Sequence, residues 1–254
     1  MSDTGTQERL LREAEQLFAE QGYERMSLRA VTRRAGANLA AVNYHFGSKR
    51  GLIIAVLRRH IEPLNAERLA MLQSARDTAG GQPLPVPTII DALLEPMARR
   101  ALRVEGGSRV FFKGLGRMLG EWREFMPMIF REFFTDLAKV SLAELRRTLP
   151  ELPESELQWR FFFMISTMLG TFARQEALSE IGIPVSEDDL QRQLLPRMRH
   201  YVCAGIEAPM SGAPAFTGSQ TRPDAVIDDQ LRADAVNEGQ LRANADVEPT
   251  EVAR

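Results

Sequence analysis

The chain has 254 residues, of which 44% are apolar and 26% charged, and its formal net charge is -2. This composition predicts a soluble globular protein with one large or two modest domains. The single cysteine, Cys203, excludes an internal disulfide framework and fits a reducing cytoplasm. The polar N-terminal segment does not have the pattern of a secretory signal, and the most apolar stretch, Phe161 to Ala173, is too short to cross a bilayer.

The charges are distributed unevenly along the chain. Residues 25–59 carry eight cations and no acid, whereas residues 1–24 carry six acids and two arginines. A solvated helix surface usually mixes the two signs, so a compact basic patch favours a face that binds a polyanion.

The first 60 residues contain the pattern of four helices. Leu10, Ala14 and Leu17 recur at helical spacing in the first. The second, third and fourth helices each follow a residue whose side chain suits an N-cap. The first, second and third helices are each expected to end at a glycine. The caps are Ser27 for residues 28–35, Asn38 for residues 39–44, and Ser48 for a helix that continues toward residue 75. The terminating glycines are Gly22, Gly36 and Gly47.

Two of these helices, residues 28–35 and 39–44, are joined by a turn centred on one glycine, which predicts a helix-turn-helix. In that motif the second helix enters the major groove of DNA. Small residues at Ala40 and Ala41 would let the backbone approach the DNA closely.

Polar groups at the end of the predicted recognition helix suit phosphate binding. Tyr44 and His45 can donate hydrogen bonds to phosphates, and Phe46 is interpreted as a core anchor. Ser48, Lys49 and the N–H groups that open the following helix form a second predicted phosphate site.

Beyond residue 76 the pattern changes twice. Residues 77–87, DTAGGQPLPVP, read as a linker, and residues 206–254 as a disordered acidic tail. The segment between them is helical in pattern, so the fold is predicted to be all-α. The helices expected there are Thr88–Val104, Ser108–Trp122, Met126–Leu149, Glu154–Ser179 and Ser186–Gly205. The predicted domains are a DNA-binding domain at 1–60, a helical domain at 61–205 and the tail at 206–254.

Residues 7–57 resemble the DNA-binding domain of the TetR/AcrR-type transcriptional regulators. The resemblance lies in the opening amphipathic helix, the turn at Gly22-Tyr23 and the Tyr-His-Phe-x-x-Lys signature from Tyr44 to Lys49. It implies that Arg29 contacts a base or a phosphate. Many relatives carry an aromatic residue at the position of Asn43, whose amide could instead bond bidentately to adenine. The predicted DNA-binding residues are Ser27, Arg29, Asn38, Ala40, Ala41, Asn43, Tyr44, His45, Ser48 and Lys49.

The C-terminal half is similar, more weakly, to the fatty-acid-responsive PsrA-type branch. That resemblance implies an effector pocket and a dimer interface built from residues 159–173 and 190–202. The abundance of Phe and Met in the central helices is consistent with an adaptable apolar pocket, although plain core packing is the more common reason for any one of them. The predicted pocket residues are Phe111, Phe112, Met118, Trp122, Phe125, Met128, Phe130, Phe163, Met164 and Met168.

Together these patterns predict a homodimeric repressor that a small hydrophobic effector, in the fatty acyl class, releases from a double-stranded DNA operator. Two alternatives stay open: a ligand-independent DNA-binding regulator or activator, and an enzyme acting on an acyl ligand. The enzyme is disfavoured because no catalytic motif is present. No cofactor, metal site or membrane partner is predicted.

Overall fold

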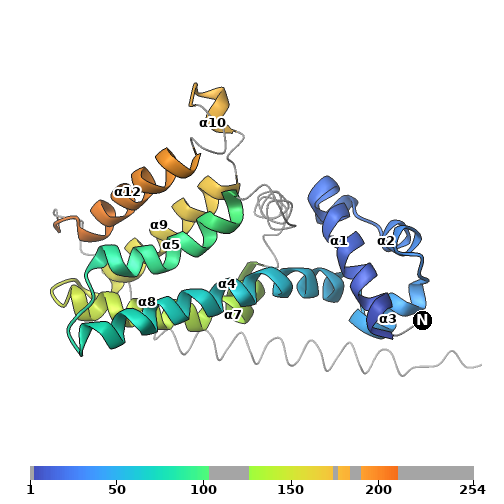
Figure 1. The fold of residues 1–254 in the computed structure, drawn as a ribbon, viewed down its shortest axis with the longest axis horizontal. Coiled ribbons are helices and arrows are strands. Elements are labelled where there is room, and N and C mark those ends of the chain that lie inside the picture. The colour runs from blue at the N-terminus through green and yellow to red at the C-terminus, as the bar shows by residue number, and fades with distance from the viewer. Residues whose placement is uncertain (1–2, 103–125, 174–176, 184–189, 211–254) are drawn as a thin grey trace, which may run out of the picture. The chain divides into compact units, whose positions relative to one another are not determined.

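The computed structural model describes residues 3–102, 126–173, 177–183 and 190–210 (Figure 1). Within these ranges all regular structure is helical, which confirms the predicted all-α class. The described residues up to Pro209 belong to one compact unit. Most of the predicted acidic tail, and the predicted helix at 108–122, lie outside the described residues.

The N-terminal head consists of α1 (Asp3–Arg25), α2 (Leu28–Ala35), α3 (Leu39–Phe46) and the start of α4 (Lys49–Ala79). Its core takes one fully buried stripe from α1, together with side chains from α2, α3 and α4. These buried residues include Leu10, Ala14, Leu17, Phe18, Val31, Val42, Leu52 and Ile53. The spacing of apolar residues in the first 60 positions therefore predicted the helices of this head. The predicted end of the first helix at Gly22 is corrected, because α1 continues to Arg25 with Gly22 inside it in a non-helical conformation (φ 77°, ψ 177°).

The long helix α4 begins beside the recognition helix and continues into the second half of the fold (Figure 1). It contacts α1 and α3 in the head and α5, α7 and α8 beyond it. The predicted domain boundary at residue 60 falls within this helix, and Pro63 lies inside it. Since proline removes a backbone donor from a helix interior, α4 lacks one of its regular hydrogen bonds there.

Beyond the head, α5, α7 and α8 pack against α4, and α5 also lies against α9 and α12. The bounds beyond the head are α5 Val86–Leu102, α7 Met126–Phe133, α8 Thr135–Thr148, α9 Glu154–Ala173, α10 Ala177–Glu180, a π-helical turn η1 Leu190–Leu194 and α12 Leu195–Glu207.

The single helix predicted over residues 126–149 is wrong, because the structure divides it into α7 and α8 at Phe134. Phe134 has φ -119° and ψ -10°. Next to it, the carbonyl of Phe133 accepts a hydrogen bond from the side-chain amide of Asn65 at 2.6 Å. This carbonyl is therefore bonded across to α4 at the break, a tertiary contact that periodicity does not reveal.

Candidate DNA-binding face and apolar cavity

The helix-turn-helix is fixed by side-chain caps at both of its helices. Ser27 Oγ accepts from the backbone N–H of Ala30 at 3.2 Å, and Asn38 Oδ1 accepts from Ala41 N–H at 2.9 Å. Between the helices, Gly36 has φ 60°, a left-handed conformation that glycine adopts without strain. The predicted caps are confirmed. The side chains of Ser27 and Asn38 therefore already use an oxygen to cap α2 and α3.

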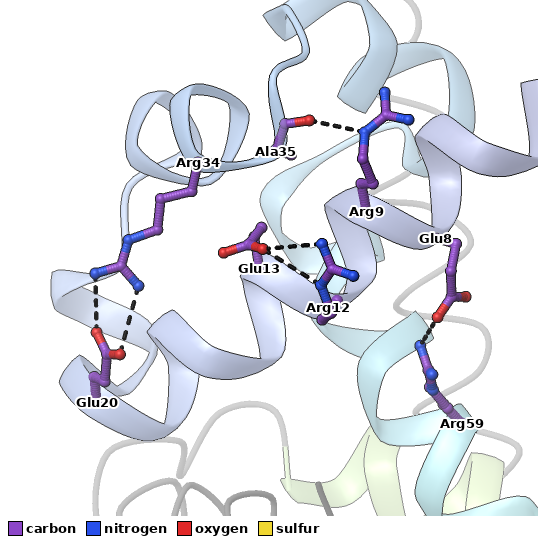
Figure 2. A network of polar contacts seen from close by, with 8 residues as sticks. All are labelled: Glu8, Arg9, Arg12, Glu13, Glu20, Arg34, Ala35 and Arg59. Atoms are coloured by element: carbon purple, nitrogen blue, oxygen red, sulfur yellow. Dashed lines mark hydrogen bonds and ion pairs between the residues drawn. The ribbon is translucent and has the colours of Figure 1, made fainter. Parts of the chain in front are cut away.

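Acidic residues of α1 neutralise part of the basic segment within the head (Figure 2). Glu20 pairs with Arg34 at 3.2 Å, and Glu8 pairs with Arg59 at 2.6 Å. On the same helix, Arg9 Nε donates to the carbonyl of Ala35, at the end of α2, at 3.0 Å. These contacts tie α1 to α2 and α4, so not all eight cations of residues 25–59 are available to a polyanion.

Other cations of the segment remain exposed. Arg25, Arg29 and Arg33 make no ion pair with any residue that the structure describes. Arg29 and Arg33 lie one helical turn apart and therefore share a face of α2. On α3, Asn43 is exposed and Tyr44 is 77% exposed. We call these five residues the basic face; they combine uncompensated positive charge with an amide and a phenol on the second helix of the motif.

The other predicted DNA-binding residues of α3 differ in exposure. Ala40 is exposed and Ala41 half-buried, while Val42 beside them is fully buried. His45 is half-buried, and its ring lies 5.0 Å from the ring of Tyr44, edge to face. Phe46 is partly buried against the core, as predicted for an anchor. Small residues on the exposed side of α3 leave its backbone accessible.

Lys49 has a structural contact as well as its predicted role toward phosphate. Its ammonium lies 4.3 Å from the ring centroid of Tyr23 and donates to the carbonyl of Glu24 at 3.3 Å. Burial lowers the pKa of Lys49, and the carboxylate of Glu24 opposes that shift. Ser48 Oγ accepts from the N–H of Gly51 at 3.0 Å, which confirms the third predicted cap. Lys49 therefore holds the turn after Gly22 against the start of α4.

The second feature is an apolar cavity between helices α4, α5, α7 and α9. Its volume is about 20 Å³, room for about one water molecule. Its lining residues are Arg68, Met97, Phe130, Phe134, Ile165, Met168 and Leu169. Small-molecule pockets usually enclose about 300–1,000 Å³, so this cavity would have to widen to admit an effector.

The predicted pocket residues do not all meet at this cavity. Phe130 and Met168 line it, and Met164 is buried in the core. Met128 is half-buried and contacts the guanidinium of Arg50, whereas Phe163 is 58% exposed on α9. The five others, Phe111, Phe112, Met118, Trp122 and Phe125, lie outside the described residues.

Sequence reasoning missed the polar residue of this cavity. Arg68 is 3% exposed and occupies the buried stripe of α4, four residues after Leu64 and four before Leu72. The sequence did contain a signal for it, because Arg68 occupies a position at which the helical spacing of Leu64 and Leu72 calls for an apolar residue. Detecting it would have required following the apolar spacing of α4 past residue 60.

Over the described residues, no helix is long and apolar enough to span a membrane. The same residues include no group of three or more His, Cys, Asp or Glu side chains placed to hold a metal ion.

A helix-turn-helix with an exposed basic face, continued by a long helix into a helical bundle that encloses a cavity, defines a DNA-binding transcriptional regulator. Sequence comparison specifies the family. Residues 10–56 match the family described as bacterial regulatory proteins, tetR family, and residues 91–205 match the one described as tetracyclin repressor-like, C-terminal domain. The chain belongs to the TetR family of transcriptional regulators. A search of curated proteins found no match.

Proposed function

We propose that this protein is a homodimeric repressor whose affinity for its operator falls when a small hydrophobic effector binds at the apolar cavity and widens it. The observation that carries the proposal is the course of α4. This helix starts directly after the recognition helix, at Lys49, and lines the cavity with Arg68. One continuous helix therefore belongs both to the DNA-binding head and to the wall of the cavity.

Contacts between α1 and α4 support this coupling. Glu8 pairs with Arg59, and Glu15 Oε1 lies 2.9 Å from His60 Nε2, both members of the second pair being largely buried. Movement of α4 would therefore carry α1 with it and change the placement of the basic face. An effector with different affinities for two positions of α4 would shift their populations. A coupling free energy of about 1–3 kcal/mol would change operator affinity about 5- to 150-fold.

The homodimer is supported by an aromatic cluster on the outside of α9. Trp159, Phe162 and Phe163 are each more than half exposed, and the rings of Trp159 and Phe163 stack with centroids 5.7 Å apart. Contiguous exposed apolar area of this kind is typical of a protein interface. A two-fold dimer would place two recognition helices about 34–36 Å apart, so we expect a pseudopalindromic operator.

For the predicted contacts, we propose that Arg29 and Asn43 read bases while Tyr44, His45 and Lys49 contact phosphates. The protein would act in the cytoplasm and without catalysing a reaction. The PsrA-type resemblance also supports an effector of the fatty acyl class, and this finer assignment is part of the proposal.

Fluorescence anisotropy with the DNA that flanks the protein's own gene tests the proposal. We expect tight binding at fixed salt, with affinity lowered by a member of a panel of apolar effectors, fatty acids and acyl-CoA thioesters included. Light scattering of the protein without DNA should give the mass of two chains. Tight binding that no effector changes would instead favour the ligand-independent regulator. A monomer in solution and on DNA would refute the dimer.

A further inference from the structure

Lys49, the first residue of α4, is held by two contacts with the last residues of α1. Its ammonium lies 4.3 Å from the ring centroid of Tyr23, and it donates to the backbone carbonyl of Glu24 at 3.3 Å. The face of an aromatic ring and a carbonyl oxygen both attract a cation through partial negative charge. These two contacts therefore orient the ammonium without neutralising its charge.

The conformation of Gly22 allows both contacts to form. Gly22 is buried, and its φ of 77° and ψ of 177° interrupt α1 three residues before the helix ends at Arg25. Glycine adopts this positive φ without steric strain. Residues after the interruption no longer continue the line of the helix. The ring of Tyr23 and the carbonyl of Glu24 therefore both meet Lys49, which lies 25 positions after Glu24 in the chain.

The two contacts order a side chain that would otherwise be mobile. A lysine side chain has one of the largest rotamer entropies of any residue, and a DNA contact must offset its loss. Ordering Lys49 in the free protein reduces that loss when DNA binds. An ammonium has three N–H donors, of which the carbonyl of Glu24 accepts one. Lys49 is only half-buried, so the ordered ammonium keeps an accessible side for a further acceptor.

We propose that Tyr23 is a positioning residue for DNA binding, whose ring holds the ammonium of Lys49 in place for a backbone phosphate. Lys49 begins α4 two residues after Gly47, which ends the recognition helix α3, so the ring also fixes the ammonium relative to α3. A phosphate contact fixes the register of a protein on DNA and carries no sequence information. This inference rests on the proposed contact of Lys49 with a phosphate and adds the residue that prepares it.

A double-mutant cycle in fluorescence anisotropy tests the proposal, with the DNA that flanks the protein's own gene and a random duplex as probes. Tyr23→Leu removes the ring and should weaken binding to both DNAs about 2- to 5-fold, as the strength of a cation–π contact implies. Tyr23→Phe keeps the ring and should bind normally. Lys49→Met keeps the apolar stem without the charge and should weaken binding to both DNAs. On that background Tyr23→Leu should cause no further loss.

The matched control is Tyr44→Leu, which removes an exposed tyrosine of α3 from the same head. Its effect on DNA affinity should be the same with either residue at position 49, because Tyr44 is expected to act independently of Lys49. Circular dichroism melts of each variant establish that the head is folded.

The outcomes separate this inference from the proposed function. Equal losses from Tyr23→Leu with and without Lys49 would show that the ring only supports the head, and would overturn the positioning role. Normal binding by Tyr23→Leu, together with weakened binding by Lys49→Met, would refute the role of Tyr23 and leave the phosphate contact intact. Normal binding by Lys49→Met would refute the proposed phosphate contact itself.

Nuclear magnetic resonance of the unmodified protein decides the question if Tyr23→Leu does not fold. With isotope-labelled lysine, the ring current of Tyr23 should shift the ε-methylene protons of Lys49 upfield, and Lys49→Met identifies this signal by its absence. We expect the upfield shift both in the free protein and in the DNA complex. Loss of the shift on DNA binding would show that Lys49 leaves the ring to reach the phosphate, and would overturn the proposal.

Discussion

Gly51 is the position where one methyl group should distort the recognition helix. The chain reverses between α3 and α4 at Gly47, with φ 72°, and this reversal places the carbonyl of Phe46 over the first turn of α4. A Cβ atom on Gly51 would lie 2.0 Å from the Phe46 oxygen and 3.2 Å from its carbonyl carbon. Because the obstacle is backbone, no rotamer change can relieve the contact, and α3 must shift relative to α4.

The size of the effect follows from two opposing terms. Alanine gains about 0.5–1 kcal/mol over glycine within a helix. Overpacking typically costs about 1–3 kcal/mol, and a main-chain obstacle favours the upper part of that range. We therefore expect Gly51→Ala to lower the free energy of unfolding by about 1–2 kcal/mol, or the melting temperature by roughly 2–8 °C. Displacing α3 enough to lose one good base contact would weaken operator binding about 5- to 150-fold.

Circular dichroism melts and operator anisotropy on the same preparations measure both effects. The control is Gly205→Ala in α12, where an added Cβ meets no atom within 4 Å, so this variant should be more stable by about 0.5–1 kcal/mol and bind DNA normally. Unchanged stability and unchanged operator affinity in Gly51→Ala would show that the junction between α3 and α4 does not constrain the recognition helix.

Four further outcomes are expected. Asn43→Ala should reduce the preference for operator over random DNA by about 1–3 kcal/mol in competition anisotropy, and an equal loss on both DNAs would show that Asn43 reads no base. Phe163→Ser should weaken the dimer in sedimentation runs at low concentration; an unchanged dimer would place the interface elsewhere. Pro63→Ala restores a donor within α4 and should stabilise the fold by up to about 3 kcal/mol in urea titrations; unchanged or lowered stability would show that Pro63 is required for the packing of α4. Burial raises the pKa of the Cys203 thiol, so a thiol reagent at pH 8 should react about tenfold more slowly with native protein than with protein in urea, and equal rates would contradict that burial.

The head was predictable from sequence because its structure is governed by local rules. Apolar spacing predicted the helices, and the caps at Ser27, Asn38 and Ser48 formed with the expected N–H partners. Each of these interactions joins residues three apart, so the information needed for it lies within one turn of chain.

The distribution of charge on the head could not be predicted in the same way. The count of cations in residues 25–59 did not distinguish Arg34 and Arg59, which pair with α1, from Arg29 and Arg33, which remain exposed. Pairing of Arg59 with Glu8 joins residues 51 positions apart. Such contacts depend on how α1 crosses α2 and α4, which helical periodicity does not specify.

The sequence by itself determined the helical class, the helix-turn-helix and the likeness to a family of regulators, since these follow from short-range patterns. The tertiary structure alone decided that α7 ends at Phe133, where Asn65 bonds its carbonyl, and that Arg68 is buried beside an apolar cavity. The physical reason is that burial is a property of packed helices. From sequence alone, an arginine four residues from a leucine is expected to be exposed to solvent. Arg68 is buried because residues of α5, α7 and α9 pack around it.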